Sequence, residues 1–293
     1  DSACVLPAFS LADDELEVIR RQTQAIAVEL GVKGLINIQY AIRNEQLYVI
    51  EVNPRASRTV PYVSKAIGKP LAKIAARVMA GKSLEELDFT EEIQPSHMAV
   101  KCPVFPFGKF SGVDTLLGPE MKSTGEVMGI DEHFGSAFAK AYTAAGHILP
   151  EKGTIFITVR NRDKRSVIFL AKRLSDLGYD IVATQGTATV LRRSGIEAEQ
   201  ISRVSDPTGG RNALDLIRDG RIDLIINTPT AGQEPHEDQL TIRREAIMYQ
   251  VPTITTMAGA MVAALGLEVV RSGRIEPRAL QEYHAIMDGN GSG

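Results

Sequence analysis

The second half of the chain alternates short apolar segments with helical segments, and this alternation constrains the fold most strongly. Residues 163–177 repeat apolar side chains with the period of a helix that buries one face. Apolar strands that alternate with helices predict an α/β fold with a doubly wound parallel sheet. The strands are predicted over 154–159, 179–184, 198–204, 222–227 and 251–256, and further helices over 188–194, 212–219, 238–249 and 259–267.

Polar residues follow several of these predicted strands. Binding sites in doubly wound sheets lie beyond the carboxyl ends of the strands. Segment 184–188 (TQGTA) turns from a strand into a helix, and the first amide groups of a helix suit an anion. This pattern predicts a site for a phosphorylated small ligand, although ordinary helix caps and a solvated lysine remain an alternative. The residues concerned are Lys164, Thr184, Thr187, Arg203, Asn227 and Thr228.

The first half carries a polar segment at the end of an expected β-hairpin. Segment 51–58 (EVNPRASR) closes a hairpin that begins with 34–42. Hard divalent cations take oxygen ligands from carboxylates and amides. Arginine binds phosphate oxygens through a fork of N–H groups. This segment therefore predicts a divalent metal held against a polyphosphate.

The metal hypothesis depends on the register of the hairpin. A three-residue turn at 43–45 would pair Asn37 with Glu51 and Gln39 with Val49, which places Gln39 diagonally from Glu51 on the same face. A two-residue turn would place Gln39 and Glu51 on opposite faces. The alternative is a solvated hairpin face with one glutamate, because Asn-Pro at a strand end is also ordinary turn chemistry.

The remaining segments suggest a second domain. A helix is expected over 13–30 with Asp13 as its cap. The break at 68–70 (GKP) should divide 59–80 into two helices, because proline disfavours helical backbone just before it. Residues 96–130 should form short strands and loops, and 132–145 a helix. The length of 293 residues favours two domains, which we place at 1–148 and 149–293.

Composition excludes several classes of function. The net charge of −3 gives no electrostatic basis for nucleic acid binding. No apolar run approaches the roughly 18 residues that span a bilayer, so no membrane segment is expected. The two cysteines, Cys4 and Cys102, form no disulfide framework, which predicts a cytoplasmic location. The chain opens without a methionine and soon enters a helix, so we expect that sequence precedes it.

Three segments carry a specific resemblance. Segments 51–61 (EVNPRASRTVP), 78–84 (VMAGKSL) and 122–129 (KSTGEVMG) are similar to the carboxy-terminal third of the carbamoyl phosphate synthetase large chain. The resemblance extends in order from residue 1 to about residue 267. It implies the carboxy-terminal half of an ATP-grasp domain, of α+β type with an antiparallel hairpin. It further implies an attached regulatory domain of the methylglyoxal synthase type.

The resemblance implies an ATP-dependent ligase that phosphorylates carbamate. In this reading Gln39, Glu51 and Asn53 bind two Mg²⁺ or Mn²⁺ ions, and Gln39 and Glu51 also adjoin ATP. Arg55 and Arg58 would contact the phosphates as catalytic residues. K⁺ is a further candidate cofactor. Metal ions and arginines suffice for this chemistry, because phosphoryl transfer needs positioning and charge neutralisation.

The resemblance also implies partners and an effector. The six polar residues beyond the strand ends match positions that hold a nucleotide effector, UMP or IMP. The expected protein partners are the rest of the large subunit, which carries the upstream ATP-grasp halves, and a glutamine amidotransferase small subunit. The product would serve pyrimidine and arginine biosynthesis. One rival is a stand-alone nucleotide-sensing module without catalysis, and another is a methylglyoxal synthase.

The sequence departs from the family pattern in three places. The amino half of the ATP-grasp unit is missing, so this chain alone should not complete an ATP site and is expected to be a fragment or half of a split subunit. Asp1 matches an acidic residue of the ornithine site, but Cys102 stands where a glutamate is expected. Arg211 stands where methylglyoxal synthases need a carboxylate, and a permanent cation cannot act as a general base.

Overall fold

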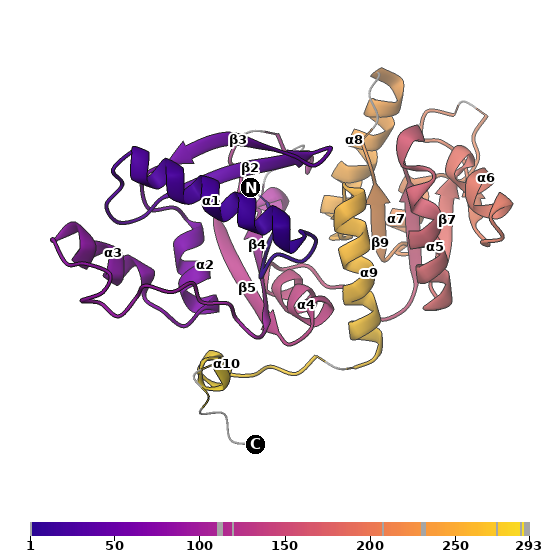
Figure 1. The fold of residues 1–293 in the computed structure, drawn as a ribbon. Coiled ribbons are helices and arrows are strands. Elements are labelled where there is room, and N and C mark those ends of the chain that lie inside the picture. Colours follow the sequence, from indigo (N-terminus) through magenta and orange to yellow (C-terminus); the bar gives the residue numbers. More distant parts are fainter. Residues whose placement is uncertain are drawn as a thin grey trace. The chain divides into compact units, whose positions relative to one another are not determined.

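The computed structural model describes residues 2–109, 114–118, 120–206, 208–229, 233–273, 275–287 and 289. It divides into two compact units, drawn in Figure 1. The first unit comprises Asp1–Cys4 and Val100–Glu276, and the second comprises Val5–Ala99 and Pro277–Gly293.

The second unit contains a long helix, a hairpin and three shorter helices. The long helix begins at Asp13, and its N-cap is Ala12. The prediction that Asp13 caps the helix is therefore wrong: the side chain of Glu15 reaches back and accepts a hydrogen bond from the Ala12 backbone N–H at 2.9 Å. The elements are α1 (Asp13–Glu29), β2 (Asn37–Arg43), β3 (Gln46–Asn53), α2 (Thr59–Ala66), α3 (Leu71–Met79) and α10 (Leu280–Met287).

The helical part of this unit confirms one expectation and adds one element. The break before Pro70 separates α2 from α3, as proline predicts. Helix α10 was not predicted. Its Tyr283 is buried, and the ring of His284 hydrogen-bonds the Lys65 carbonyl at the end of α2 at 2.6 Å.

The hairpin has a different register from the predicted one. Arg43 pairs with Gln46, so the turn contains only Asn44 and Glu45, and both have the positive φ that type I′ turns require. A β-bulge then leaves Ile50 without a partner and places Gln39 directly opposite Glu51. The predicted three-residue turn and diagonal geometry are therefore wrong. A two-residue turn alone would place Gln39 and Glu51 on opposite faces, but the bulge shifts the register by one residue and returns them to the same face.

The first unit is built on a five-stranded parallel sheet, as the alternation of strands and helices predicted. The strand order is β10-β9-β6-β7-β8. Chain direction across the sheet reverses between β6 and β9, and the carboxyl edge at such a switch point is where doubly wound sheets bind ligands. The strands are β6 (Thr154–Thr158), β7 (Asp180–Thr184), β8 (Glu199–Ile201), β9 (Leu224–Asn227) and β10 (Thr253–Ile254).

Helices cover both faces of this sheet. Phe156, Val182 and Ile225 form one buried cluster with apolar residues of α7 and α8. Their chain neighbours point to the other face, because side chains alternate along a strand. The helices are α5 (Ser166–Asp176), α6 (Gln185–Arg193), α7 (Ala213–Arg218), α8 (Gln233–Met248) and α9 (Met257–Arg271).

Residues 100–153, which precede the parallel sheet, also belong to the first unit. A β-carbon on Gly129 would lie 2.1 Å from the Ala137 carbonyl oxygen, so this glycine permits β5 (Gly125–Asp131) to pack tightly on α4 (Phe134–Ala144). Helix α4 in turn packs on α9, where Gly135 faces the backbone of Leu265. The compact units therefore divide near residue 100, whereas the sequence places the domain boundary at 148/149. A small sheet has the order β1-β4-β5, with β1 (Cys4–Leu6) and β4 (Met98–Val104).

Candidate functional site

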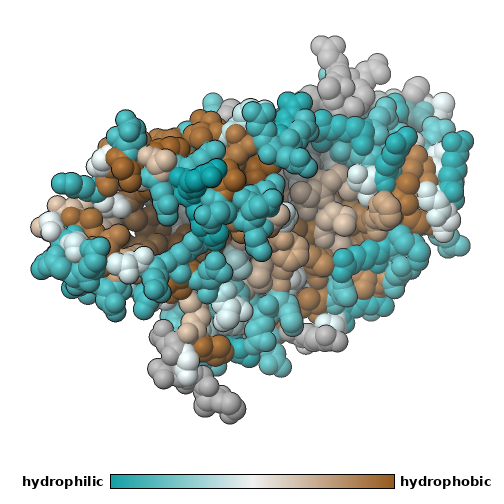
Figure 2. Space-filling model, viewed as in Figure 1, coloured by the Kyte–Doolittle hydropathy of each residue, from teal (hydrophilic) through white to brown (hydrophobic). Residues whose placement is uncertain are grey.

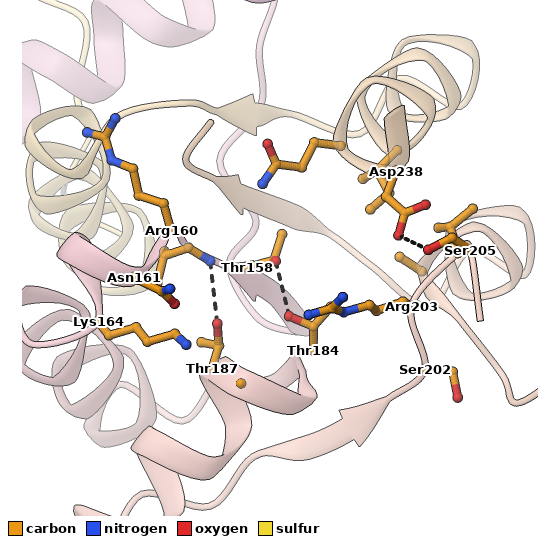
Figure 3. Close-up of a pocket in the computed structure, with 16 residues that line it drawn as sticks. Thr158, Arg160, Asn161, Lys164, Thr184, Thr187, Ser202, Arg203, Ser205 and Asp238 are labelled. Atoms are coloured by element: carbon orange, nitrogen blue, oxygen red, sulfur yellow. Dashed lines mark hydrogen bonds between the residues drawn. The ribbon is translucent and has the colours of Figure 1, made fainter. Parts of the chain in front are cut away.

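A pocket lies at the carboxyl edge of the parallel sheet, with a volume of about 190 Å³ (Figure 3). The last residues of β6 and β7, Thr158 and Thr184, meet there, with their hydroxyl oxygens 3.1 Å apart. Thr184 is the N-cap of α6, but its hydroxyl does not cap the helix. The first amide groups of α6 therefore remain available to a ligand.

Basic side chains gather around this helix start. Lys164 and Arg203 approach the pocket from opposite sides in Figure 3. A β-carbon on Gly186 would lie 3.0 Å from the Lys164 ammonium nitrogen, so the glycine leaves room for this lysine beside the first turn of α6. In the described part of the chain neither cation forms a side-chain ion pair. The Thr187 hydroxyl accepts a hydrogen bond from the Val159 backbone N–H at 3.4 Å. These groups favour an anion.

The pocket also has an acidic group. Asp238 on α8 accepts a hydrogen bond from the Ser205 hydroxyl at 2.9 Å, and it is the only carboxylate among the described residues that line the pocket. A ligand with an anionic group toward Lys164 and hydrogen-bond donors toward Asp238 would match both ends. Sequence reasoning missed Asp238, because nothing in the helical pattern of α8 shows which side chain reaches the strand ends.

Two of the six predicted nucleotide-binding residues lie beneath the pocket and do not line it. Asn227 and Thr228 are fully buried at the end of β9. The Thr228 hydroxyl accepts a hydrogen bond from the backbone N–H of Arg160 at 3.0 Å, and its carbonyl accepts one from the Gln239 side chain at 3.4 Å. Both of these donors line the pocket. The other four predicted residues line it directly: Lys164, Thr184, Thr187 and Arg203.

The hairpin brings the predicted metal-binding residues together. The side-chain amides of Gln39 and Asn53 donate hydrogen bonds to the same oxygen of Glu51, at 2.7 and 2.8 Å. Arg55 donates one to the Asn53 side-chain oxygen at 3.4 Å, and Arg58 is the N-cap residue of α2. All five polar residues therefore belong to the same end of the hairpin or to the turn that follows it.

These residues fit a divalent cation in their chemistry. Glu51 offers a carboxylate, and each amide carries an oxygen that suits a hard cation. No cluster of three His, Cys, Asp or Glu residues exists in the described segments, so the set would rely on one carboxylate and two amides. Cys102 adds no anion elsewhere, because burial raises the pKa of its thiol to about 11. Asp1, the other residue of the ornithine comparison, lies outside the described residues.

Comparison with known families agrees with both regions. Residues 1–87 match the family described as the ATP binding domain of the carbamoyl-phosphate synthase L chain, and residues 166–255 match the MGS-like domain. Carbamoyl phosphate synthase large chains from Acidobacterium capsulatum and Archaeoglobus fulgidus are each 53% identical across 97% of this chain. The chain belongs to the carbamoyl phosphate synthase large-chain family.

The chain resembles the carboxy-terminal portion of the carbamoyl phosphate synthase large chain. The Synechocystis large chain is 52% identical across 97% of this chain, yet the match spans only 26% of that relative. A methylglyoxal synthase from Elizabethkingia anophelis aligns over 39% of the chain and 79% of that structure, at 20% identity and a TM-score of 0.33. Within the described residues no helix is both long and apolar enough to cross a membrane.

One departure from methylglyoxal synthases has a structural counterpart. Arg211, which occupies the place of the expected catalytic carboxylate, forms an ion pair with Asp219 and does not line the pocket. Asp238 lies within the pocket, and one of its oxygens accepts a hydrogen bond from the Ser205 hydroxyl.

Proposed function

We propose that this chain forms the carboxy-terminal part of a carbamoyl phosphate synthase large chain and carries two sites. The hairpin end contributes to an ATP- and metal-dependent site that phosphorylates carbamate. The pocket on the parallel sheet binds a nucleoside monophosphate effector, UMP or IMP. The observation that carries the proposal is the meeting of Lys164, Arg203 and the start of α6 in one pocket, within a chain about half identical to large chains.

In the pocket, the phosphate of the nucleotide would lie between Lys164 and Arg203, against the amide groups of α6. Charge-assisted hydrogen bonds of this kind are stronger than neutral ones. Asp238 would accept hydrogen bonds from hydroxyl or amino groups of the nucleoside. Asn227 and Thr228 would act from below by fixing the backbone of Arg160, whose N–H bonds Thr228.

At the hairpin, Glu51 would hold two Mg²⁺ or Mn²⁺ ions together with Gln39 and Asn53, and Gln39 and Glu51 would adjoin ATP. Arg55 and Arg58 would contact the phosphates of ATP. The bound ions would neutralise phosphate charge, and the arginines would orient the transferred group, which is what phosphoryl transfer requires. The carbamate oxygen would serve as the nucleophile, so no protein nucleophile is needed.

The hairpin also suggests where the rest of the large chain would lie. Tyr48, Val49 and Ile50 on β3 are exposed, and Figure 2 shows hydrophobic side chains gathered over this strand. A two-stranded sheet is marginally stable without a covered face, and exposed apolar patches are typical of interaction surfaces. The upstream ATP-grasp half would cover this strand, and a glutamine amidotransferase small subunit would supply ammonia in the cytoplasm.

We retain 148/149 as the proposed domain boundary.

The test is to mix the purified chain with the preceding part of the large chain and the small subunit. Carbamoyl phosphate formation from glutamine, bicarbonate and ATP should appear only when all parts are present. Failure to form product, with each part folded, would contradict the assignment of the hairpin to the synthetic site. Methylglyoxal formation from dihydroxyacetone phosphate by the chain alone would contradict a pocket that binds without catalysis.

A further inference from the structure

The first unit buries one arginine completely. Arg243 on α8 has a relative exposure of 0%. A guanidinium group stays charged at any pH at which the protein is folded. Its burial is therefore costly unless its N–H groups donate to acceptors in the protein. The hydrogen-bond partners of Arg243 show which segments of the first unit it joins.

Its main partner is far away in the sequence. Asp114 accepts hydrogen bonds from Nε and one terminal nitrogen of Arg243, at 2.6 and 2.8 Å. This forked geometry is the strongest that arginine makes with a carboxylate. Asp114 also accepts the backbone N–H of Leu116 at 3.1 Å, and α8 contacts the turn η1 (Phe107–Lys109). Asp114 and the turn η1, which both lie between β4 and β5 in the sequence, are therefore attached to α8.

Its third contact is with a residue beneath the pocket. The remaining terminal nitrogen of Arg243 donates to the side-chain oxygen of Asn227 at 3.1 Å. Because arginine has only donors, it forces Asn227 to present its oxygen and to turn its amide nitrogen elsewhere. That nitrogen is buried and has no hydrogen-bond partner in the described structure. Asn227 is thus held in one orientation by Arg243.

The pocket is built on the same few residues. Thr228 follows Asn227 directly and bonds the backbone of Arg160 and the side chain of Gln239, both of which line the pocket. Gln239 lies one helical turn before Arg243 on α8. A change in the position of Arg243 would therefore reach the pocket along β9 and along α8.

We propose that Arg243 is a positioning residue of the nucleotide pocket and that Asp114 holds it in place. The ion pair then makes ligand binding depend on the segment around Asp114, on the other side of the proposed domain boundary at 148/149. The inference rests on the proposed nucleotide site and adds the residue pair through which the neighbouring segment influences it.

The chain offers a matched control. Arg243 and Arg244 are adjacent on α8, the first buried and the second exposed. Calorimetric titration with UMP should show binding weakened by at least roughly tenfold in Arg243→Met, as expected when one hydrogen-bonding group of a site is lost. Arg244→Met should bind within about twofold of the parent. Arg243→Lys should recover part of the loss, because it keeps the charge but not the fork.

A milder variant keeps the test decisive if Arg243→Met does not fold. Asp114→Asn keeps the shape of the side chain and removes its charge, and it should also weaken UMP binding. Hydrogen exchange of the Arg160 amide should accelerate in the same variant, because Asp114 holds Arg243, which orients the residue next to Thr228. Unchanged UMP affinity and unchanged Arg160 exchange in folded Asp114→Asn would overturn the inference. A parent chain that binds no UMP would contradict the proposed function, and Arg160 exchange alone would then decide the inference.

Discussion

The pocket and the hairpin differ in how completely this chain builds them. The pocket rests on a parallel sheet whose central strands are buried on both faces, and its basic, acidic and hydroxyl groups all come from the first unit. The hairpin is a two-stranded sheet with exposed apolar residues, and the one carboxylate of its proposed metal site, Glu51, is bonded by two neighbouring amides. Under the proposed function, we therefore expect the pocket to bind its effector without other proteins and the hairpin to need further protein for its chemistry.

The largest expected effect tests the stability of the pocket region. Phe156 is fully buried in β6, so Phe156→Ala should lower the unfolding free energy of the first unit by about 3–5 kcal/mol. Scanning calorimetry suits a chain without tryptophan. Phe169→Ala is the control, because Phe169 is 76% exposed on α5 and its loss should have little effect. Equal effects of the two substitutions would contradict the core described for this sheet.

The second prediction concerns the chemistry of the hairpin. Glu51→Gln in the assembled enzyme should reduce carbamate phosphorylation by about 100-fold or more, because the charge that compensates the metal ions is lost. UMP binding to the pocket should not change. Glu45→Gln, in the turn of the same hairpin, provides the control. Near-normal synthesis by Glu51→Gln would rule out the metal assignment.

A third prediction concerns the pocket itself. Lys164→Ala should weaken UMP binding by about 1–3 kcal/mol, the expected loss for one charged hydrogen bond. Lys172→Ala serves as the control, because Lys172 lies on α5 in an ion pair with Asp176 and does not line the pocket. An unchanged dissociation constant for UMP in Lys164→Ala, measured by calorimetric titration, would contradict the assignment of Lys164 to the phosphate site.

The smallest expected effect tests whether the hairpin is uncovered in this chain. Ile50 is 63% exposed, so Ile50→Thr should change the unfolding free energy by less than about 0.5 kcal/mol. In the complete large chain the same substitution should lower the unfolding free energy by about 1 kcal/mol or more, because the apolar side chain of Ile50 would there be buried against the upstream half. Equal costs in the two proteins would contradict the proposed covering of β3.

The two regions also differ in how far the sequence predicts them. Polar residues at the ends of parallel strands were predictable, because the topology brings those ends to one edge of the sheet. Four of the six predicted residues line the pocket, whereas Asp238 could not be found, because the rotation of α8 depends on packing. The hairpin register could not be read either, because Ile50 is an ordinary strand residue and carries no signal of a bulge.

The burial of Asn227 and Thr228 and the pairing of Arg243 with Asp114 also lay beyond the sequence. Contacts between residues far apart in the chain require the tertiary structure. The same holds for α10, which returns to the second unit after a linker and has no strong pattern of its own.

The most direct test of the account is a calorimetric titration of this chain with UMP, repeated with IMP and ornithine. We predict saturable nucleotide binding in the micromolar range without any other protein, because the described residues that line the pocket all belong to the first unit. Absence of any nucleotide binding, while circular dichroism shows the chain to be folded, would contradict an autonomous effector site.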